Sequence, residues 1–318
     1  MKSKRMYLTA PRTFEMREDD LSPGTGEILV RVKVCGLCNW ELNHYKGIIA
    51  DYPKVIGHEL AGEVVQTGEG ASKFKVGDRV VVLPDNLGGF SELLVAPEEI
   101  CFKLNDDVDI TWALGEPLKC IITVVHAARV QAGDTGVVVG CGPMGLWTIQ
   151  ALKGNTLSKL VAIDVDNSKL ELAKKNGATH CINPKECNAA DELSKITDGR
   201  MADFVIEGTG IPSLLESALD YLKRSGRGRL VVMSSHESVT KEFDFRKAHV
   251  KGIDMSFPFP VYSDDQLDDM RIAVDYINNK VFDMSDIISH TFTLDTLDKA
   301  FEALENKPAG YKKGIVLI

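Results

Sequence analysis

The stretch Val137-Val138-Val139-Gly140-Cys141-Gly142-Pro143-Met144-Gly145 decides the fold of this chain. A β-branched apolar run enters a Gly-x-Gly-x-x-Gly turn, and an apolar segment of helical character, residues 146–152, follows it. A second apolar run, residues 160–163, ends in Asp164, whose spacing from Gly140 is close to the roughly 20 residues expected of a dinucleotide-binding unit. Strand, turn, helix, strand and acid in this order predict a dinucleotide-binding fold.

The residues of this turn have separate predicted roles. Gly140 permits the tight turn, Gly142 lets the backbone approach a pyrophosphate, and Gly145 lets the helix pack closely on the strand. Pro143 and Met144 begin the helix, whose N-terminus offers free N–H groups and the positive end of its dipole to phosphates, so both are candidate cofactor-binding residues.

The acid after the second strand predicts which nucleotide binds. Asp164 can accept hydrogen bonds from both hydroxyls of a ribose and would repel a 2′-phosphate, so NAD is favoured over NADP. A glycine-rich turn without a ligand is the alternative interpretation. The strand, the helix and the acid around the turn argue against it.

Composition excludes several classes of function. The chain has 318 residues, 44% of them hydrophobic and 26% charged, which is ordinary for a soluble globular protein of one or two domains. Its net charge of −9 favours neither nucleic acid nor an anionic membrane as a partner. No apolar run approaches the ~20 residues of a membrane span, and the N-terminus does not resemble a secretory signal. With seven cysteines, an odd number, we expect a reducing cytoplasm and no disulfides.

The pattern of short apolar runs divides the chain. Residues 1 to about 115 look all-β, with strands expected at residues 28–34, 62–65, 79–83 and 92–95 between Pro, Gly and Asp turns. From about 117 to 255 strands alternate with helices, which predicts a parallel, doubly wound α/β sheet. The tail adds helical patterns at residues 266–278 and 297–304 and an apolar end, residues 314–318.

Two stretches of the first region carry candidate metal ligands. They are Cys35-Gly36-Leu37-Cys38-Asn39-Trp40-Glu41 and Gly57-His58-Glu59-Leu60-Ala61-Gly62-Glu63-Val64. Thiolate, imidazole and carboxylate are ligand types for zinc. The alternatives are two buried thiols, a redox-active Cys-x-x-Cys pair, and a surface turn at His58-Glu59.

Together these motifs resemble the zinc-dependent medium-chain dehydrogenase/reductase superfamily, which includes alcohol, sorbitol and threonine dehydrogenases. The Gly-His-Glu-x-x-Gly-x-Val pattern from Gly57 is the most specific of them, and the motifs run in the family's order over nearly the whole chain. The others are Gly36-Leu37-Cys38 with Glu41 and Gly47, Val76-Gly77-Asp78-Arg79-Val80, Glu116-Pro117-Leu118 and the glycine turn from Gly140.

The resemblance implies a GroES-like β catalytic domain over residues 1–116, a Rossmann NAD-binding domain over 117–258 and a return to the first domain over 259–318. It implies one catalytic zinc held by Cys38, His58 and Glu59. Glu116 matches an acid of the polyol branch that holds the zinc water or replaces it as fourth ligand. The ethanol-active branch has a cysteine in this region, and Cys120 keeps that option open.

Further positions gain roles by resemblance. Glu41 matches an acid that bonds the metal-bound histidine and fixes its tautomer. Lys169 matches a basic residue near the adenosine ribose, and Thr209 lies in a turn that flanks the cofactor. Lys313 matches a pyrophosphate contact only weakly, because a lysine near a C-terminus is usually solvated. Cys35 matches no ligand position and is interpreted as a packed thiol.

Three departures from the family matter. The lobe with four cysteines for a structural zinc is missing, since residues 82–90 connect two strands directly, so we expect at most one metal per chain.

The second departure is Trp40, which stands where the family usually has a Ser or Thr that passes the substrate proton onward. An indole N–H only donates, so it cannot relay a proton. A proton must therefore leave through the zinc water, Glu116, the ribose hydroxyls or His44, although His44 is equally well interpreted as a surface loop residue. The third departure is Lys119, which follows Glu116-Pro117-Leu118 at a position where small residues are more usual. We expect it to be a solvated lysine at the start of a helix rather than a residue that binds an anionic substrate.

These features predict a zinc- and NAD-dependent dehydrogenase for a secondary alcohol, a polyol, sugar or cyclitol, in a homodimer or homotetramer. Trp40 offers a flat apolar face on which a sugar ring could stack. Two alternatives stay open. One is a zinc-free NADPH-dependent quinone or enoyl reductase, and the other is a nucleotide-binding redox sensor without turnover.

Overall fold

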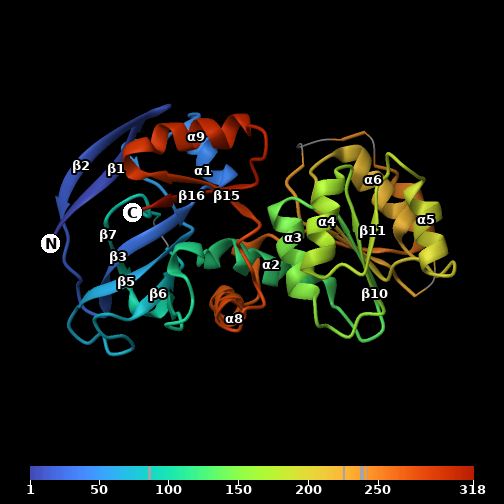
Figure 1. Cartoon of the computed structure of the whole chain (residues 1–318), viewed down its shortest axis with the longest axis horizontal. Helices are drawn as coiled ribbons and strands as arrows, with labels where there is room; N and C mark the ends of the chain where they lie inside the picture. The colour runs from blue at the N-terminus through green and yellow to red at the C-terminus, as the bar shows by residue number, and fades with distance from the viewer. Residues whose placement is uncertain (85–86, 225, 237–239, 242) are drawn as a thin grey trace. The chain divides into compact units, whose positions relative to one another are not determined.

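The computed structural model describes residues 1–84, 87–224, 226–236, 240–241 and 243–318. The chain divides into two compact units (Figure 1). The first comprises residues 1–119 and 270–318, and the second residues 120–269. The chain leaves the first unit within helix α2 (Gly115–Ala128) and returns to it within α8 (Gln266–Asn278). No helix among the described residues is long and apolar enough to cross a membrane.

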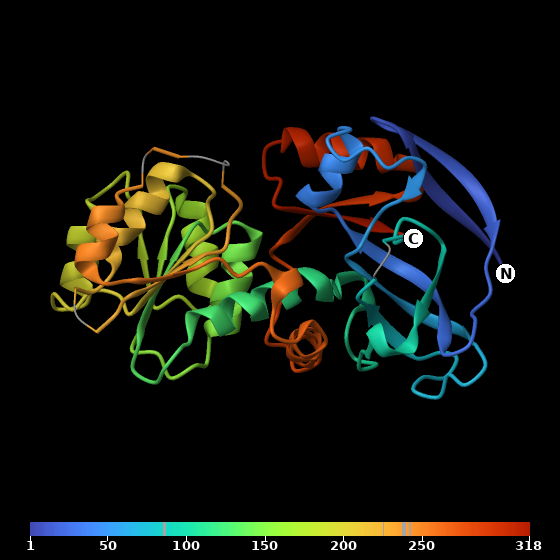
Figure 2. The ribbon, with the colours of Figure 1, turned by 180° about the vertical axis from the view of Figure 1, so that it is seen from behind.

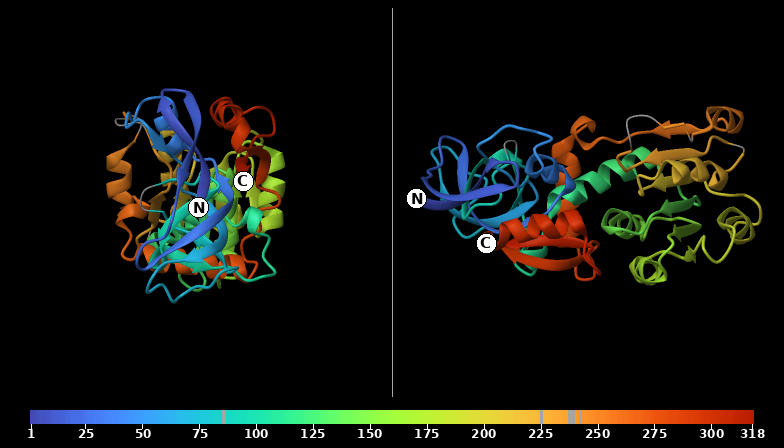
Figure 3. Two further views of the ribbon diagram at one scale, coloured as in Figure 1. Left: turned by 90° about the vertical axis from the view of Figure 1, so that its left-hand side faces the viewer. Right: turned by 90° about the horizontal axis from the view of Figure 1, so that it is seen from above.

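The first unit is built on β-strands in its described residues. Its main sheet has the order β15-β16-β3-β5-β6-β8, with β7 also paired to β3, and a smaller sheet has the order β2-β1-β4. Figure 3 shows β1 and β2 as a long curved hairpin. The strands are β1 (Lys2–Ala10), β2 (Thr13–Asp20), β3 (Glu27–Gly36), β4 (Lys54–Val55), β5 (Leu60–Thr67), β6 (Arg79–Val82), β7 (Leu93–Pro97), β8 (Cys101–Lys103), β15 (Ile288–Thr293) and β16 (Lys313–Leu317).

Strand β3 is the centre of this unit. It pairs antiparallel with β5, β7 and β16, so the C-terminal strand is joined to the N-terminal region. Its side chains at Val30, Val32 and Cys35 are fully buried in one core cluster that also contains Phe90 and Phe301. The return of the tail to the first unit therefore completes a core that residues 1–119 begin.

The first region is not all-β as the sequence pattern predicts. Helix α1 (Asn39–Tyr45) lies between β3 and β4, and α9 (Leu297–Asn306) packs against it. Short 3-10 helices of this region are η1 (Glu98–Ile100) and η2 (Ile110–Trp112), and a further one, η4 (Leu294–Thr296), lies in the tail. The sulfur of Cys38 accepts the N–H of Trp40 and caps α1, which is too short to show a helical period in sequence.

The described part of the second unit contains a parallel sheet with the order β11-β10-β9-β12-β13-β14, and helices cover both of its faces (Figures 1 and 2). This confirms the predicted doubly wound α/β fold. The order reverses between β9 and β12, which is where such sheets bind ligands, at the carboxyl ends of the strands. The strands are β9 (Thr135–Val139), β10 (Lys159–Ile163), β11 (His180–Ile182), β12 (Phe204–Glu207), β13 (Arg229–Val232) and β14 (Asp254–Ser256).

The helices of the second unit follow the predicted alternation. They are α3 (Pro143–Leu152), α4 (Asn167–Asn176), α5 (Ala189–Ile196), α6 (Pro212–Tyr221), α7 (Phe245–Lys251) and the 3-10 helix η3 (Pro260–Tyr262). Residues 82–90 were predicted to connect two strands directly; Val82 is the last residue of β6 and residues 83–90 lie between β6 and β7, with Asp85 and Asn86 outside the described residues.

Candidate metal centre and nucleotide-binding edge

His58 is placed by a backbone conformation that only glycine adopts readily. Gly57 has φ +105°, and a Cβ there would lie 2.9 Å from Sγ of Cys35 and 2.9 Å from the backbone nitrogen of Phe90. The chain therefore turns tightly just before β5, and His58 and Glu59 immediately precede the first residue of that strand.

Glu41 of α1 fixes the orientation of this histidine. The backbone N–H of His58 donates to Oε1 of Glu41 (3.0 Å), and Nδ1 of the same residue contacts the same oxygen. A carboxylate only accepts, so Nδ1 carries a proton, and in the neutral ring Nε2 keeps its lone pair. Nε2 is then the atom of His58 that can bind a metal.

The predicted ligands lie in two overlapping groups. The ligand atoms of Cys38, Glu41 and His58 lie within 4.8 Å of one another, and so do those of His58, Glu59 and Glu116. Nε2 of His58 is 3.5 Å from Oε2 of Glu116. Residues from the cap of α1, the turn before β5 and the first turn of α2 thus meet at one place in the first unit.

Two buried lysines correct the expectation that they are solvated. Lys119 is 3% exposed, and its Nζ is 3.4 Å from Oε1 of Glu116. Lys313, 8% exposed, donates to Oε1 of Glu59 (2.8 Å). A lysine is buried where a carboxylate pairs with it, and here both partners belong to the predicted metal cluster. The pyrophosphate contact of Lys313 stays a prediction.

The charges of the cluster fit a divalent cation. They come from the carboxylates of Glu41, Glu59 and Glu116, the thiolate form of Cys38, and the ammonium groups of Lys119 and Lys313. In the forms that bind a metal, with Cys38 as a thiolate and His58 neutral, these groups carry a surplus of two negative charges. Uncompensated charge is costly away from water, and one divalent cation balances it.

Four of these groups have a raised pKa and bind protons more readily than usual: Cys38, whose pKa is raised by burial, Lys313, His58 and Glu59. Burial by itself would lower the pKa of His58, but the charge of Glu41 together with side-chain hydrogen bonds to Cys38, Glu116 and Glu41 outweighs burial, and the pKa lies well above its usual value. Burial raises the pKa of Glu59, against the opposing charge of Lys313. Positive charge is therefore favoured at this place, and the mixed sulfur, nitrogen and oxygen donors are those that suit zinc.

His44 is a buried residue, so its interpretation as a surface loop histidine is wrong. Its side chain is 2% exposed, and its Nδ1 lies 2.9 Å from Oδ1 of the half-exposed Asp51. The ring of Trp40 stands edge-on to the rings of His44 (4.6 Å) and His58 (5.8 Å) and is 44% exposed. Trp40 therefore covers the histidine of the cluster with an apolar, accessible surface.

Two further cysteines lie outside both groups. Cys35 is fully buried in the core of the first unit, which agrees with a packed thiol. Cys120 belongs to neither group of possible ligands among the described residues.

The glycine turn of the second unit has the geometry that its sequence predicts. Gly140 has φ +93°, and a Cβ on Gly145 would lie 1.9 Å from the carbonyl oxygen of Gly140. A Cβ on Gly142 would meet no atom within 4 Å, so the space above it is open. Pro143 and Met144 form the first turn of α3, and Gly142 is its N-cap, so the N-terminus of this helix adjoins the open space.

Asp164 and Lys169 lie beside this turn. Oδ2 of Asp164 accepts the backbone N–H of Cys141 (2.8 Å), and Oδ1 accepts that of Asp166 (3.0 Å). Each carboxylate oxygen has a second lone pair, so ribose hydroxyls can still bind. Lys169 lies in the first turn of α4.

Sequence reasoning did not identify a polar cluster at the same edge of the sheet. Glu207, fully buried at the end of β12, accepts hydrogen bonds from the N–H and the hydroxyl of Thr209 and from Ser234 and His236. Glu207 and Thr209 lie in the turn predicted to flank the cofactor, but no motif indicated that residues after β13 complete the cluster.

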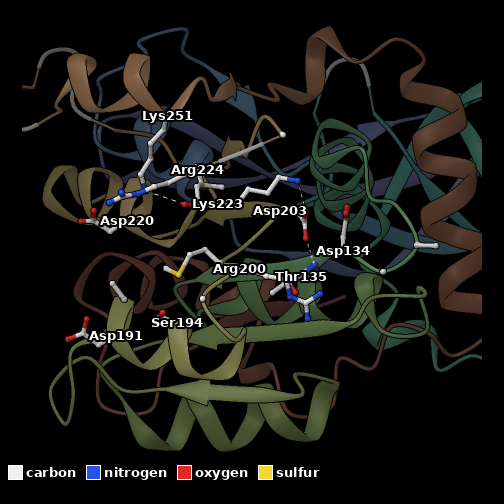
Figure 4. Close-up of a pocket in the computed structure, with 17 residues that line it drawn as sticks. Asp134, Thr135, Asp191, Ser194, Arg200, Asp203, Asp220, Lys223, Arg224 and Lys251 are labelled. Carbon is white, nitrogen blue, oxygen red and sulfur yellow. Dashed lines mark hydrogen bonds and ion pairs between the residues drawn. The ribbon is translucent and has the colours of Figure 1, made fainter.

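A hollow of about 1050 Å³ lies at the opposite, amino-terminal edge of the sheet (Figure 4). Lys251 donates to the carbonyl oxygens of Leu219 and Leu222 near the end of α6, and Lys223 pairs with Asp203 (2.6 Å). Basic groups at helix C-termini bind the last carbonyls, so these side chains have structural partners without a ligand.

The fold and the site together define a class of protein. A β-rich unit carries a cluster of thiol, imidazole and carboxylate groups. A doubly wound unit carries a glycine-rich turn at the carboxyl ends of its parallel strands, where such folds bind nucleotides. Two family models match in the same order. Residues 24–106 match the alcohol dehydrogenase GroES-like domain, and residues 143–279 match zinc-binding dehydrogenase.

Curated relatives and a solved structure agree with these matches. Sorbitol dehydrogenase of Bacillus subtilis (strain 168) is 31% identical over 252 residues, 69% of this chain and 71% of the relative. (R,R)-butanediol dehydrogenase of the same strain is 32% identical over 267 residues, 72% and 77% of the two chains. The crystal structure of 2R,3R-butanediol dehydrogenase from Bacillus subtilis matches with a TM-score of 0.86 and 26% identity, over 99% of both chains. The chain belongs to the zinc-type medium-chain dehydrogenase superfamily.

Proposed function

We propose that this protein is a zinc-dependent dehydrogenase that transfers hydride between a secondary alcohol and NAD. The observation that carries the proposal is the meeting of Cys38, His58, Glu59 and Glu116 in a chain that also holds the glycine turn. A polyol, sugar or cyclitol is the proposed substrate class, because Glu116 takes the place of a cysteine and the relatives are sorbitol and butanediol dehydrogenases.

The residues of the first unit have distinct proposed roles. Cys38, His58 and Glu59 would hold the zinc, which when bound acts as a Lewis acid on an alcohol oxygen and lowers its pKa. Glu41 keeps the Nδ1 proton of His58 in place, so that Nε2 stays a lone-pair donor. Lys119 neutralises part of the charge of Glu116.

Proton release needs a path that does not use Trp40, because an indole cannot accept a proton. Glu116 is proposed as the first acceptor, since its side chain is 12% exposed and adjoins the proposed ligand His58. His44 is the second candidate. Its Nδ1 pairs with Asp51, whose side chain is 43% exposed and opens to solvent.

Metal content measured by mass spectrometry on protein purified without chelator tests the zinc. About one zinc per chain supports the proposal, followed by turnover of a polyol panel with NAD. No zinc even after zinc is supplied, with NADPH-dependent reduction of quinones or enoyl compounds, supports the metal-free reductase instead. Nucleotide binding without any turnover supports the redox sensor.

Asp164→Asn tests the proposed preference for NAD. The amide still accepts the N–H of Cys141 but loses the charge that binds ribose hydroxyls and repels a 2′-phosphate. Charge-assisted hydrogen bonds contribute about 1.5–3 kcal/mol, so we expect the KM for NAD to rise about tenfold or more while that for NADP falls. Glu171→Gln on the exposed side of α4 removes the same charge and should leave both constants unchanged. An unchanged NAD to NADP ratio in Asp164→Asn would contradict the assignment.

A homodimer or homotetramer is proposed through the end of the second unit's sheet. Strand β14 is the last strand of the sheet order, and Phe257 and Phe259 just after it are 68% and 59% exposed. Exposed apolar side chains beside a strand edge are typical of contact surfaces. Sedimentation equilibrium tests this, and a monomer at micromolar concentration would exclude it.

A further inference from the structure

The buried cluster at the carboxyl ends of β12 and β13 is organised by one carboxylate. Oε1 of Glu207 accepts the backbone N–H groups of Thr209 (2.6 Å) and Gly210 (3.2 Å). Oε2 accepts the hydroxyl of Ser234 and lies 2.8 Å from Nε2 of His236. Both oxygens of Glu207 are thus occupied by this chain's own donors, and the carboxylate has a positioning role.

The position of Glu207 decides which tautomer His236 adopts. A carboxylate only accepts, so the proton of a neutral His236 is on Nε2 and Nδ1 is a bare acceptor. Nδ1 is buried and has no hydrogen-bond partner among the described residues, although the side chain as a whole is 12% exposed. An unpaired buried acceptor costs about 1–3 kcal/mol, so its presence calls for an explanation.

The place of His236 in the sheet indicates what the partner is. His236 follows β13, at the same edge as the glycine turn, and a Cβ on Gly140 would lie 2.8 Å from Cγ2 of Thr209. The edge has two halves on either side of the reversal between β9 and β12. Asp164 lies in the half formed by β9, β10 and β11, and His236 lies in the half formed by β12, β13 and β14. A dinucleotide bound at this edge spans both halves.

We propose that Nδ1 of His236 accepts a hydrogen bond from the nicotinamide riboside half of bound NAD, and that Glu207 fixes the tautomer and orientation that make this possible. The inference rests on the proposed use of NAD. The hydroxyls of the ribose and the amide of the carboxamide are the donors that this half of the cofactor offers.

Binding constants separate this role from a purely structural one. The dissociation constants of NADH and of ADP are measured by calorimetry for the wild type, His236→Gln and His236→Asn. Gln keeps an N–H donor for Glu207 near the place of Nε2 but has no acceptor near Nδ1. Asn keeps an acceptor near Nδ1 but does not reach Glu207.

For His236→Gln we expect NADH to bind about fivefold or more weakly, because one hydrogen bond is lost, while the affinity for ADP stays the same. His236→Asn should retain more NADH affinity than His236→Gln. Unchanged NADH affinity in His236→Gln overturns the inference, and so does an equal loss for ADP, which indicates a structural role. Absence of NADH binding to the wild type is a different result, and it overturns the proposed use of NAD itself.

Discussion

Cys38→Ser and His58→Asn each lower kcat/KM by a factor on the order of a thousand or more, while NADH binds with unchanged affinity. Both side chains lie in the cluster of possible ligands in the first unit, whereas the glycine turn lies in the second. Loss of a ligand removes the Lewis acid, which supplies several kcal/mol of transition-state stabilisation, and about 4 kcal/mol corresponds to a thousandfold. Metal content should fall together with turnover.

Matched variants distinguish ligand loss from a general effect. Cys187→Ser replaces an exposed thiol outside both ligand groups and should keep full activity and full metal content. Glu41→Gln leaves the ligands in place but weakens the hydrogen bonding that orients His58, so we expect kcat/KM to fall about 10–100-fold. Full turnover in both Cys38→Ser and His58→Asn would contradict the zinc mechanism. Loss of NADH binding in them would instead indicate misfolding.

Local sequence patterns predicted the fold of the second unit well. Gly140, Gly142 and Gly145 act within a single turn, and the alternation of strands and helices needs no distant partner to be recognised. The fold class and the family were therefore predictable from sequence. Helix α1 was not, because seven residues between a strand and a loop are too few to establish a helical period.

The environment of the candidate site was less predictable than its members. Glu59 and Lys313 are 254 residues apart, and nothing near either residue in the sequence reveals the pair. Lys119 was expected in solvent because most lysines are exposed, but its side chain is buried and forms an ion pair with Glu116, three residues earlier on the same helix. Burial of a charge depends on the tertiary partner, which sequence motifs do not record.

Lys313→Met tests that pair and is expected to destabilise the chelator-treated protein by about 3–5 kcal/mol. Glu59 is 1% exposed, and removal of its lysine leaves a buried carboxylate without a counter-charge, which is the costly case for a buried ion pair. Urea denaturation followed by tryptophan fluorescence measures the loss, since Trp40 and Trp112 lie in the first unit.

Two comparisons show whether loss of the ion pair between Lys313 and Glu59 causes the destabilisation. Lys299→Met on the exposed side of α9 should change stability by no more than about 0.5 kcal/mol. Glu59→Gln combined with Lys313→Met removes both charges, so the double variant should be more stable than Lys313→Met alone. Zinc should also reduce the loss in Lys313→Met, because a cation at the cluster supplies the charge that the lysine no longer provides. A stability of Lys313→Met equal to that of the wild type, or a double variant no better than the single one, would show that Lys313 does not stabilise the charge of Glu59.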